Sequence, residues 1–172
     1  ADAGESRFGS ARERRFSPRS LSFGAQWPLA GGWRASATAG RTERAPAYYE
    51  LYANGVHVAT GAYERGDPDL GKERSRHLDL GLQWQQGPAE FKASVFSTRF
   101  SNYLALDATG RDIELPNEDG GLDAVPEYAF IGVPARLHGL ELEGRLRLAE
   151  RPWALDASAA LDLVRGTNST TG

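Results

Sequence analysis

About six stretches of the chain alternate between apolar and polar side chains with a period of two residues, which is typical of strands whose two faces meet different surroundings. In the clearest stretch, leucines and Trp84 alternate with polar residues from 77 to 85. The predicted strands lie near 20–28, 33–43, 75–86, 90–106, 128–149 and 153–165. We find no convincing amphipathic helix and predict an all-β fold.

The connections between these strands alternate between short and long. Tight turns rich in Gly and Pro occupy 29–32, 86–89 and 150–152. Two long polar segments, 44–74 and 107–127, join the remaining strands. This order predicts an antiparallel up-and-down sheet with short turns at one end and long loops at the other.

Composition excludes several classes of protein. The 172 residues hold 20 Lys and Arg against 23 Asp and Glu, a net charge of −3, so no basic excess points to nucleic acid. The absence of Cys excludes disulfides, cysteine zinc sites and thiol catalysis within this chain. No run approaches the roughly 20 apolar residues of a membrane-spanning helix. The mean hydropathy of −0.49 is that of a soluble domain, but it averages two unlike strand faces.

The tryptophans indicate the surroundings of the apolar face. All four lie within a few residues of a short turn, on the apolar phase of their strands: Trp27, Trp33, Trp84 and Trp153. Tryptophan collects where a membrane meets water, and a row of tryptophans at one level is typical of the aromatic belt of an outer-membrane barrel. The alternative is a soluble β-sandwich or lipocalin-like core with the tryptophans near its closed end.

A charged row occupies the opposite face of one strand. It consists of Glu141, Glu143, Arg145 and Arg147. Such a row suits a water-filled or plugged lumen, although the exposed face of a sandwich would tolerate it too. We therefore predict an antiparallel up-and-down transmembrane β-barrel, here a partial barrel of about six strands with long extracellular loops.

Three segments resemble the TonB-dependent outer-membrane receptors. Residues 44–61 read RAPAYYELYANGVHVATG, which is similar to the family's segment RAPxxxELYxNGxHxATG. Residues 63–73 read YERGDPDLGKE, similar to ExGNPxLxxE, and residues 137–144 read LHGLELEG, like the family's GxExE strand. The resemblance runs in the family's order from about residue 16 to about residue 165.

The resemblance implies a 22-stranded barrel in the bacterial outer membrane, plugged by an N-terminal domain and importing scarce ligands with energy coupled through TonB. The chain shows no plug and no TonB box, and about six strands are too few to close even the smallest barrel of eight. We therefore interpret residues 1–172 as a fragment of the C-terminal half of such a barrel. Short turns then face the periplasm and long loops the exterior.

The first long segment holds a candidate metal or ligand site. His57 is followed by three carboxylates, Glu64, Asp67 and Asp69, and the segment resembles that of the subgroup that includes zinc importers. Imidazole and carboxylates suit a borderline divalent metal. The alternative is that His57 only hydrogen-bonds within an ordered loop. We expect no resident cofactor; zinc or an iron chelate would be cargo.

The expected partners follow from the resemblance: the TonB complex through the missing plug, outer-membrane lipid, and a small metal or siderophore ligand. Near the start of the chain lies a basic cluster, Arg12, Arg14, Arg15 and Arg19, which suits either a strand end or lumen stripe, the favoured reading, or lipopolysaccharide phosphates.

We predict no catalytic residue, because GxSxG, HExxH, P-loop and GxGxxG motifs are all missing from the sequence. His77 is expected on the lumen face and His138 in the wall. Two other functions stay open at this point: a soluble β-sandwich or barrel binding module, and an outer-membrane enzyme barrel carrying a Ser/His/Asp or paired-carboxylate set.

Overall fold

The computed structural model describes residues 13–117 and 120–168. The chain divides into two compact units. Unit 1 takes its described residues from Ala1–Pro18, Glu43–Glu73 and Asn102–Val133, and unit 2 from Arg19–Thr42, Arg74–Ser101 and Pro134–Gly172. The two longest strands run through both units. Each unit is described by itself below.

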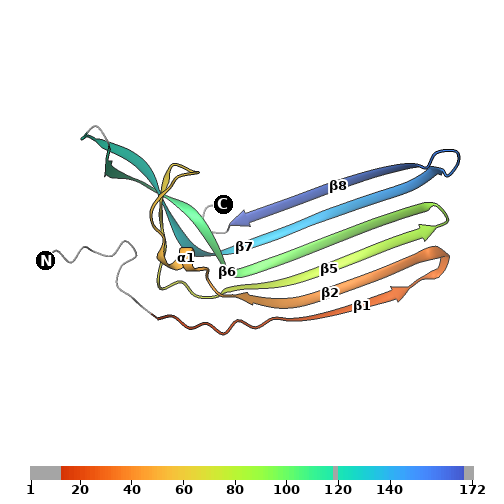
Figure 1. The fold of residues 1–172 in the computed structure, drawn as a ribbon. Coiled ribbons are helices and arrows are strands. Elements are labelled where there is room, and N and C mark those ends of the chain that lie inside the picture. Colours follow the sequence, from red (N-terminus) through yellow and green to blue (C-terminus); the bar gives the residue numbers. More distant parts are fainter. Residues whose placement is uncertain (1–12, 118–119, 169–172) are drawn as a thin grey trace. The chain divides into compact units, whose positions relative to one another are not determined.

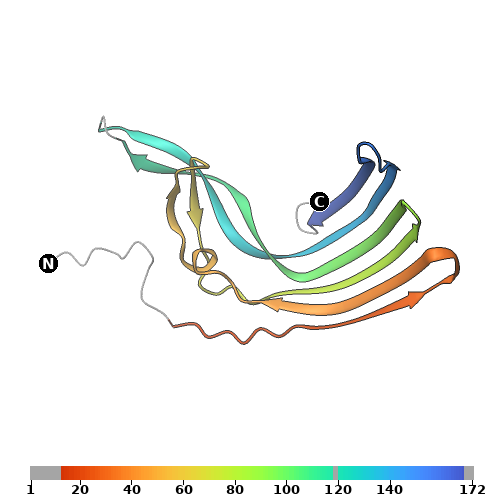
Figure 2. The same ribbon diagram turned by 45° about the vertical axis from the view of Figure 1, so that its right-hand side comes forward.

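Unit 2 is built from one sheet of long strands (Figure 1). The strands are β1 (Leu21–Pro28), β2 (Trp33–Arg44), β5 (Glu73–Gln86), β6 (Ala89–Pro116), β7 (Leu122–Ala149) and β8 (Leu155–Asn168). They follow one another in the order β1-β2-β5-β6-β7, and β8 pairs with β7. Figure 2 shows that this sheet curves from one edge to the other. Among the described residues β1 and β8 do not pair, so the sheet is open.

The pairing registers place apolar residues on one face of this sheet and polar residues on the other. Leu21 pairs with Arg41 and Trp27 with Ala35, while Leu140 pairs with Leu163. The large apolar side chains of this face are exposed: Leu21, Phe23, Trp27, Leu78, Leu80, Leu82, Val95, Leu146, Leu161 and Leu163. Phe23, for example, is 72% exposed. So many exposed large apolar side chains on one face of a sheet are unusual for a soluble monomer.

Unit 1 contains the connection from β2 to β5 and the connection from β6 to β7. The helix α1 (Tyr48–Tyr52) is followed by two short antiparallel strands, β3 (Asn54–His57) and β4 (Ala62–Arg65). β4 adds to β7 in parallel, with Tyr63 opposite Glu127. A small apolar core of Leu51, Leu70, Leu104 and Phe130 holds these segments together.

The sequence predictions of the six long strands are confirmed, and one predicted loop is wrong. β6 continues to Pro116 and β7 begins at Leu122, so 107–127 is a long hairpin rather than a loop. Each of its faces mixes polar with apolar side chains, such as Asp107 with Ile113, and pairing between strands uses the backbone, so no regular alternation marks it. At its turn the Asn117 N–H donates a hydrogen bond to the Gly121 carbonyl at 3.0 Å.

Three smaller expectations are also corrected. The strand count rises from about six to eight because β3 and β4 lie inside the first long segment. The helix α1 is only five residues long, too short to show a helical period. Trp153 was expected on a strand but lies in the turn before β8, which begins at Leu155. No helix among the described residues has the length and apolar character needed to cross a membrane.

Glycine 139 of β7 lies where a side chain has no room. A Cβ atom there would stand 2.6 Å from the Leu163 carbonyl oxygen and 2.7 Å from the ring of Phe96. Gly144, on the same strand, has no atom within 4 Å of the corresponding position. The Phe96 ring therefore packs against a stretch of backbone that only glycine leaves bare.

We predict that Gly139→Ala in the full-length receptor lowers the free energy of unfolding by about 1–3 kcal/mol, because the added methyl group overpacks this contact. The measurement is thermal or urea unfolding of the detergent-solubilised protein. Gly144→Ala is the matched control and should unfold like the parent. Equal stability of the two variants would contradict the packing described for Gly139.

Candidate functional site

In unit 1, Arg44 lies between two carboxylates and fixes the position of α1. Arg44 donates two hydrogen bonds to the Glu50 carboxylate, at 2.9 and 3.0 Å, and two to Glu73, both at 3.2 Å. Glu50 is 5% exposed, and its Oε2 also accepts the Ala47 N–H at 2.6 Å. A buried carboxylate needs such partners. Arg44 therefore joins the end of β2, the start of α1 and the start of β5.

A second set of contacts brings residues 66 and 67 back onto α1. The Gly66 N–H donates to the Ala53 carbonyl at 2.7 Å, and the Asp67 N–H donates to the Glu50 carbonyl at 3.0 Å. A Cβ on Gly66 would lie 2.5 Å from the Tyr52 nitrogen. The glycine of this segment is thus required by a backbone-to-backbone approach.

A buried carboxylate also holds β4 against β7. Glu127 is 3% exposed. It lies 3.4 Å from Arg65 and 3.0 Å from Arg111, and it accepts the Thr109 hydroxyl at 2.8 Å. The Thr109 hydrogen bond first, and then the two guanidinium groups, lower the pKa of Glu127 despite its burial. The carboxylate is therefore ionised at neutral pH.

The structure brings together two of the four residues proposed as a metal site. His57 Nδ1 lies 3.4 Å from Glu64 Oε1 and 3.2 Å from Thr60 Oγ1, and the histidine side chain is 54% exposed. Asp67 Oδ1 instead accepts the Asp69 N–H at 2.8 Å. Asp69 lies 3.5 Å from an arginine of the N-terminal segment, Arg14.

Within residues 13–117 and 120–168, no group of three or more His, Cys, Asp or Glu side chains is arranged to hold a metal ion. The His57–Glu64 pair therefore offers at most two protein ligands. Such a pair suits contact with a cargo that keeps other ligands of its own, rather than a closed structural metal site.

The tryptophans are placed in unit 2 as follows. Trp84 donates its indole N–H to the Gly31 carbonyl at 3.1 Å, and its ring centroid lies 6.1 Å from that of Trp33. Trp27 is 49% exposed and Trp153 is 79% exposed. The sandwich alternative requires all four inside one core, so these exposures contradict it.

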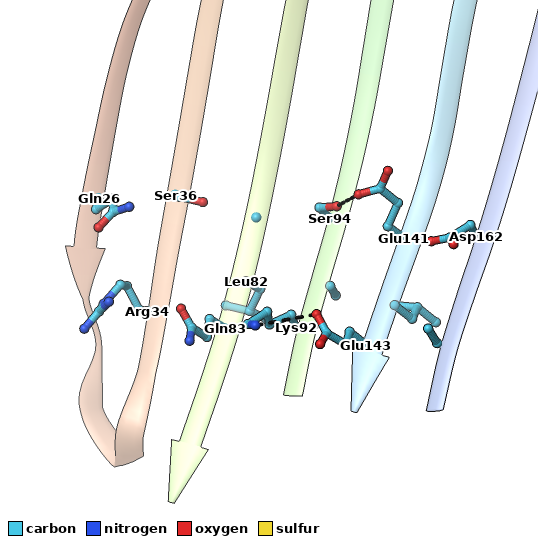
Figure 3. Close-up of a pocket in the computed structure, with 14 residues that line it drawn as sticks. Gln26, Arg34, Ser36, Leu82, Gln83, Lys92, Ser94, Glu141, Glu143 and Asp162 are labelled. Carbon is cyan, nitrogen blue, oxygen red and sulfur yellow. Dashed lines mark hydrogen bonds and ion pairs between the residues drawn. The ribbon is translucent and has the colours of Figure 1, made fainter. Parts of the chain in front are cut away.

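The polar face of unit 2 forms a charged groove of about 460 Å³ (Figure 3). Figure 3 shows Lys92 of β6 reaching Glu143 of β7, a contact of 3.5 Å, and Ser94 donating to Glu141 at 3.0 Å. Gln26, Arg34 and Ser36 lie at its other side. The charged row predicted from sequence thus faces the polar side of the sheet.

Other candidate residues have structural roles. Arg14 does not belong to a strand; it donates to the Pro68 and Leu70 carbonyls of unit 1. Arg15 pairs with Glu13 at 3.2 Å, and Arg12 lies outside the described residues. In unit 2, His77 packs against Gly40, where a Cβ would stand 2.5 Å from its ring. His138 shares the apolar face with its partner Arg165.

The family described as "TonB dependent receptor-like, beta-barrel" matches residues 2–172. The chain belongs to this family. The TonB-dependent receptor barrel accounts for the open, two-faced sheet of unit 2, and the family is one of receptors rather than enzymes.

Solved structures with the same fold include two siderophore receptors and a copper transporter. PirA from Pseudomonas aeruginosa matches with a TM-score of 0.63 and 20% identity over 87% of this chain and 28% of its own. The copper transporter OprC has a TM-score of 0.61 and 23% identity, over 88% and 21%. PirA from Acinetobacter baumannii has a TM-score of 0.52 and 17% identity, over 83% and 23%. The chain thus spans between about a fifth and under a third of these proteins.

Sequence reasoning missed the two buried carboxylates. Glu50 and Glu127 are ordinary acidic residues in polar segments, and nothing in their spacing marks them as buried. For Glu50 one signal was present: it lies with Arg44 inside the segment that resembles the receptor family. For Glu127 the arginine partners come from β4 and β6, so only the tertiary pairing identifies it.

We predict that Glu127→Gln loosens the pairing of β4 with β7, because Arg65 and Arg111 lose their buried counter-charge. In hydrogen exchange of the full-length receptor, opening at 63–65 should increase about ten-fold, equivalent to about 1.4 kcal/mol. The exposed Glu114 on β6 provides the control, Glu114→Gln.

The stability that the Glu127 carboxylate contributes depends on pH in a defined direction. Since folding lowers the pKa of Glu127, its stabilisation is complete above the ordinary glutamate pKa and is lost as the pH falls through the lowered value. The variant and the parent should therefore differ at neutral pH and converge in acid. A difference that persists unchanged in acid would contradict the role of this charge.

Proposed function

We propose that the chain forms part of the wall of an outer-membrane receptor that imports a metal ion or metal chelate with energy supplied through TonB. One observation carries the proposal: unit 2 exposes a continuous apolar face on one side of a sheet whose other side is a charged groove. Lipid outside and a hydrated lumen inside are the two surroundings that such a sheet satisfies together. The family match supports the same assignment.

The chain is proposed to be one part of a larger barrel. In a bilayer every backbone N–H and C=O must find a partner, so the outer edges of β1 and β8 require further strands. The solved structures of this fold, of which the chain covers 28% or less, are long enough to supply them. A plug domain in the complete protein would make the contact with TonB.

The direction of the barrel follows from the lengths of its connections. Short turns between β1 and β2, β5 and β6, and β7 and β8 would face the periplasm, and unit 1 would then belong to the extracellular side. The tryptophans lie near the short turns, so we assign Trp27, Trp33, Trp84 and Trp153 to the periplasmic aromatic belt. The bond from the Trp84 indole N–H to Gly31 leaves its ring available to the membrane boundary.

The cargo is proposed to be a metal ion or a metal chelate. Two of the similar solved proteins are siderophore receptors and one is a copper transporter. In this chain the exposed His57, held 3.4 Å from Glu64, offers an imidazole and a carboxylate of the kind that contact zinc or copper. Asp67 and Asp69 stay candidates only, since each already has a partner.

The test is uptake by cells that produce the full-length receptor. Radiolabelled Zn(II), Cu(II) and ferric siderophores are supplied to TonB-competent cells and to matched cells that lack TonB. We expect at least one of these cargoes to accumulate only when both the receptor and TonB are present. Accumulation of none, or accumulation without TonB, would contradict the proposed function.

The role of the His57–Glu64 pair is tested with whichever cargo the cells take up. His57→Ala and Glu64→Gln should each weaken its binding in calorimetry by about ten-fold, the effect of removing one ligand or hydrogen-bonding partner. His138→Ala, on the apolar face, is the control and should bind normally. Unchanged affinity in both test variants would remove the pair from the ligand site.

A further inference from the structure

A segment near the start of the chain clamps one turn of unit 1. Residues 13–18, which we call the strap, belong to no helix or strand. Arg14 of the strap donates to the carbonyl oxygens of Pro68 and Leu70, the second at 3.1 Å, and lies 3.5 Å from the Asp69 carboxylate. These contacts join residues that are 54 to 56 positions apart in the chain.

The clamped turn, residues 67–70, has two carbonyl groups to offer because of its own hydrogen bonds. The Leu70 N–H donates to the Asp67 carbonyl at 3.2 Å, and the Asp69 N–H donates to the Asp67 side chain at 2.8 Å. Asp followed by Pro is a favoured beginning of such a turn. The turn thus uses the oxygens of Asp67 and leaves the carbonyls of Pro68 and Leu70 for another donor. A guanidinium group has five N–H donors in a fixed plane, so it can serve two carbonyls and a carboxylate together.

The strap is itself anchored to unit 1. Phe16 packs against the small apolar core of this unit, and the guanidinium carbon of Arg14 lies 5.2 Å from the centre of the Phe16 ring. The Lys72 ammonium donates to the Ser17 carbonyl at 3.0 Å. The Arg14 side chain is 23% exposed, whereas that of the neighbouring Arg15 is 86% exposed. Arg14 is therefore held in place on both sides of the clamp.

The clamped turn lies at the base of the hairpin that carries His57 and Glu64. β4 ends at Arg65, and the turn begins two residues later. On the other side of the turn, the N–H groups of residues 66 and 67 donate to carbonyls of residues 53 and 50. The base of the hairpin is thus fixed between α1 and the strap. Its tip is exposed, with Val58 at 93%.

We propose that Arg14 is a positioning residue for the cargo: by clamping the turn it holds the β3–β4 hairpin in the arrangement in which His57 and Glu64 contact a metal ion. This role rests on the proposed function, because it requires the His57–Glu64 pair to meet the cargo. Ligands that are ordered before binding lose less conformational freedom when the metal arrives, so they bind it more tightly. The coupling is reciprocal, so a metal ion at the pair must in turn stabilise the strap.

The clamp also gives the two carboxylates of the turn structural roles. One oxygen of Asp67 accepts a hydrogen bond inside the turn, and Asp69 lies beside the Arg14 guanidinium. The positive charge of Arg14 opposes a metal cation at Asp69. In this proposal the metal contact is therefore confined to His57 and Glu64.

The experiment uses the full-length receptor in detergent, with Zn(II) alone as the probe, and measures its affinity by calorimetry. The test variant is Arg14→Gln. Arg14→Lys keeps the charge but loses the planar set of donors, so it tests for partial rescue. The matched control is Arg15→Gln, because Arg15 is exposed and lies 3.2 Å from Glu13, outside the clamp.

We expect Arg14→Gln to bind Zn(II) about ten-fold more weakly, Arg14→Lys to fall between it and the parent, and Arg15→Gln to bind like the parent. Without zinc, hydrogen exchange at the hydrogen-bonded amides of Gly66, Asp67 and Leu70 should be faster in Arg14→Gln than in the parent.

A second measurement leaves Arg14 unchanged, so it decides the matter even if the Arg14 variants do not fold. Trypsin cleaves after arginine, and the bond after Arg15 lies within the strap. Saturating Zn(II) should slow cleavage at this bond in the parent, because metal binding stabilises the clamped strap. The same zinc should give no protection in His57→Ala.

Two results would overturn the role of Arg14. One is faster exchange in the turn of Arg14→Gln with Zn(II) affinity equal to the parent's, which would make the clamp structural only. The other is trypsin cleavage after Arg15 that ignores zinc in the parent.

The outcomes also separate this inference from the proposed function. If His57→Ala weakens Zn(II) binding and Arg14→Gln does not, the metal pair stands and only the positioning role is wrong. If the parent receptor binds no Zn(II), both the metal pair and the positioning role are wrong.

Discussion

The constraint on which unit 2 depends is that each strand must satisfy two different surroundings with alternate side chains while its backbone pairs only with other strands. Hydrocarbon offers no hydrogen bonds, so the sheet has to close upon itself or upon further strands. The leucines of β5 face one side and His77, Asp79 and Gln83 the other. Where the strands approach closely, glycine replaces a side chain, as Gly139 does beneath Phe96.

Unit 1 follows a different rule because its residues are polar on most faces. Its segments are fixed by a few buried charges in place of a large core. Arg44 links Glu50 with Glu73, and Glu127 links Arg65 with Arg111. Each set of three includes a contact between segments distant in sequence, Arg44 with Glu73 and Glu127 with Arg65, and removing one partner leaves a buried charge with less compensation. A connection built in this way positions exposed groups such as His57 without placing them in an apolar interior.

Alternation predicted structure wherever the two faces of a strand differ. It identified the long strands, their turns and the charged row at Glu141, because these features follow from the period of two. It failed for 107–116, where each face mixes polar with apolar residues, and for the five-residue α1, which is shorter than two helical turns. Alternation does not mark where a strand begins: it predicts Trp153 on a strand, whereas β8 begins at Leu155. Resemblance to the family, and no spacing argument, pointed to the segment that holds Arg44 and Glu50. Only the tertiary structure could show that Arg65 and Arg111 converge on Glu127.

The central claim is that one face of unit 2 meets lipid and the other meets water, and neighbouring positions on β5 test it most directly. Single cysteines are introduced at Leu80, Leu82, Asp79 and Gln83 of the full-length receptor, each in an otherwise cysteine-free background, and labelled with an environment-sensitive fluorophore after reconstitution. Quenchers attached to lipid chains should act on Leu80→Cys and Leu82→Cys, whereas water-soluble quenchers should act on Asp79→Cys and Gln83→Cys. Quenching by water alone at all four positions, or the reverse alternation, would contradict the account.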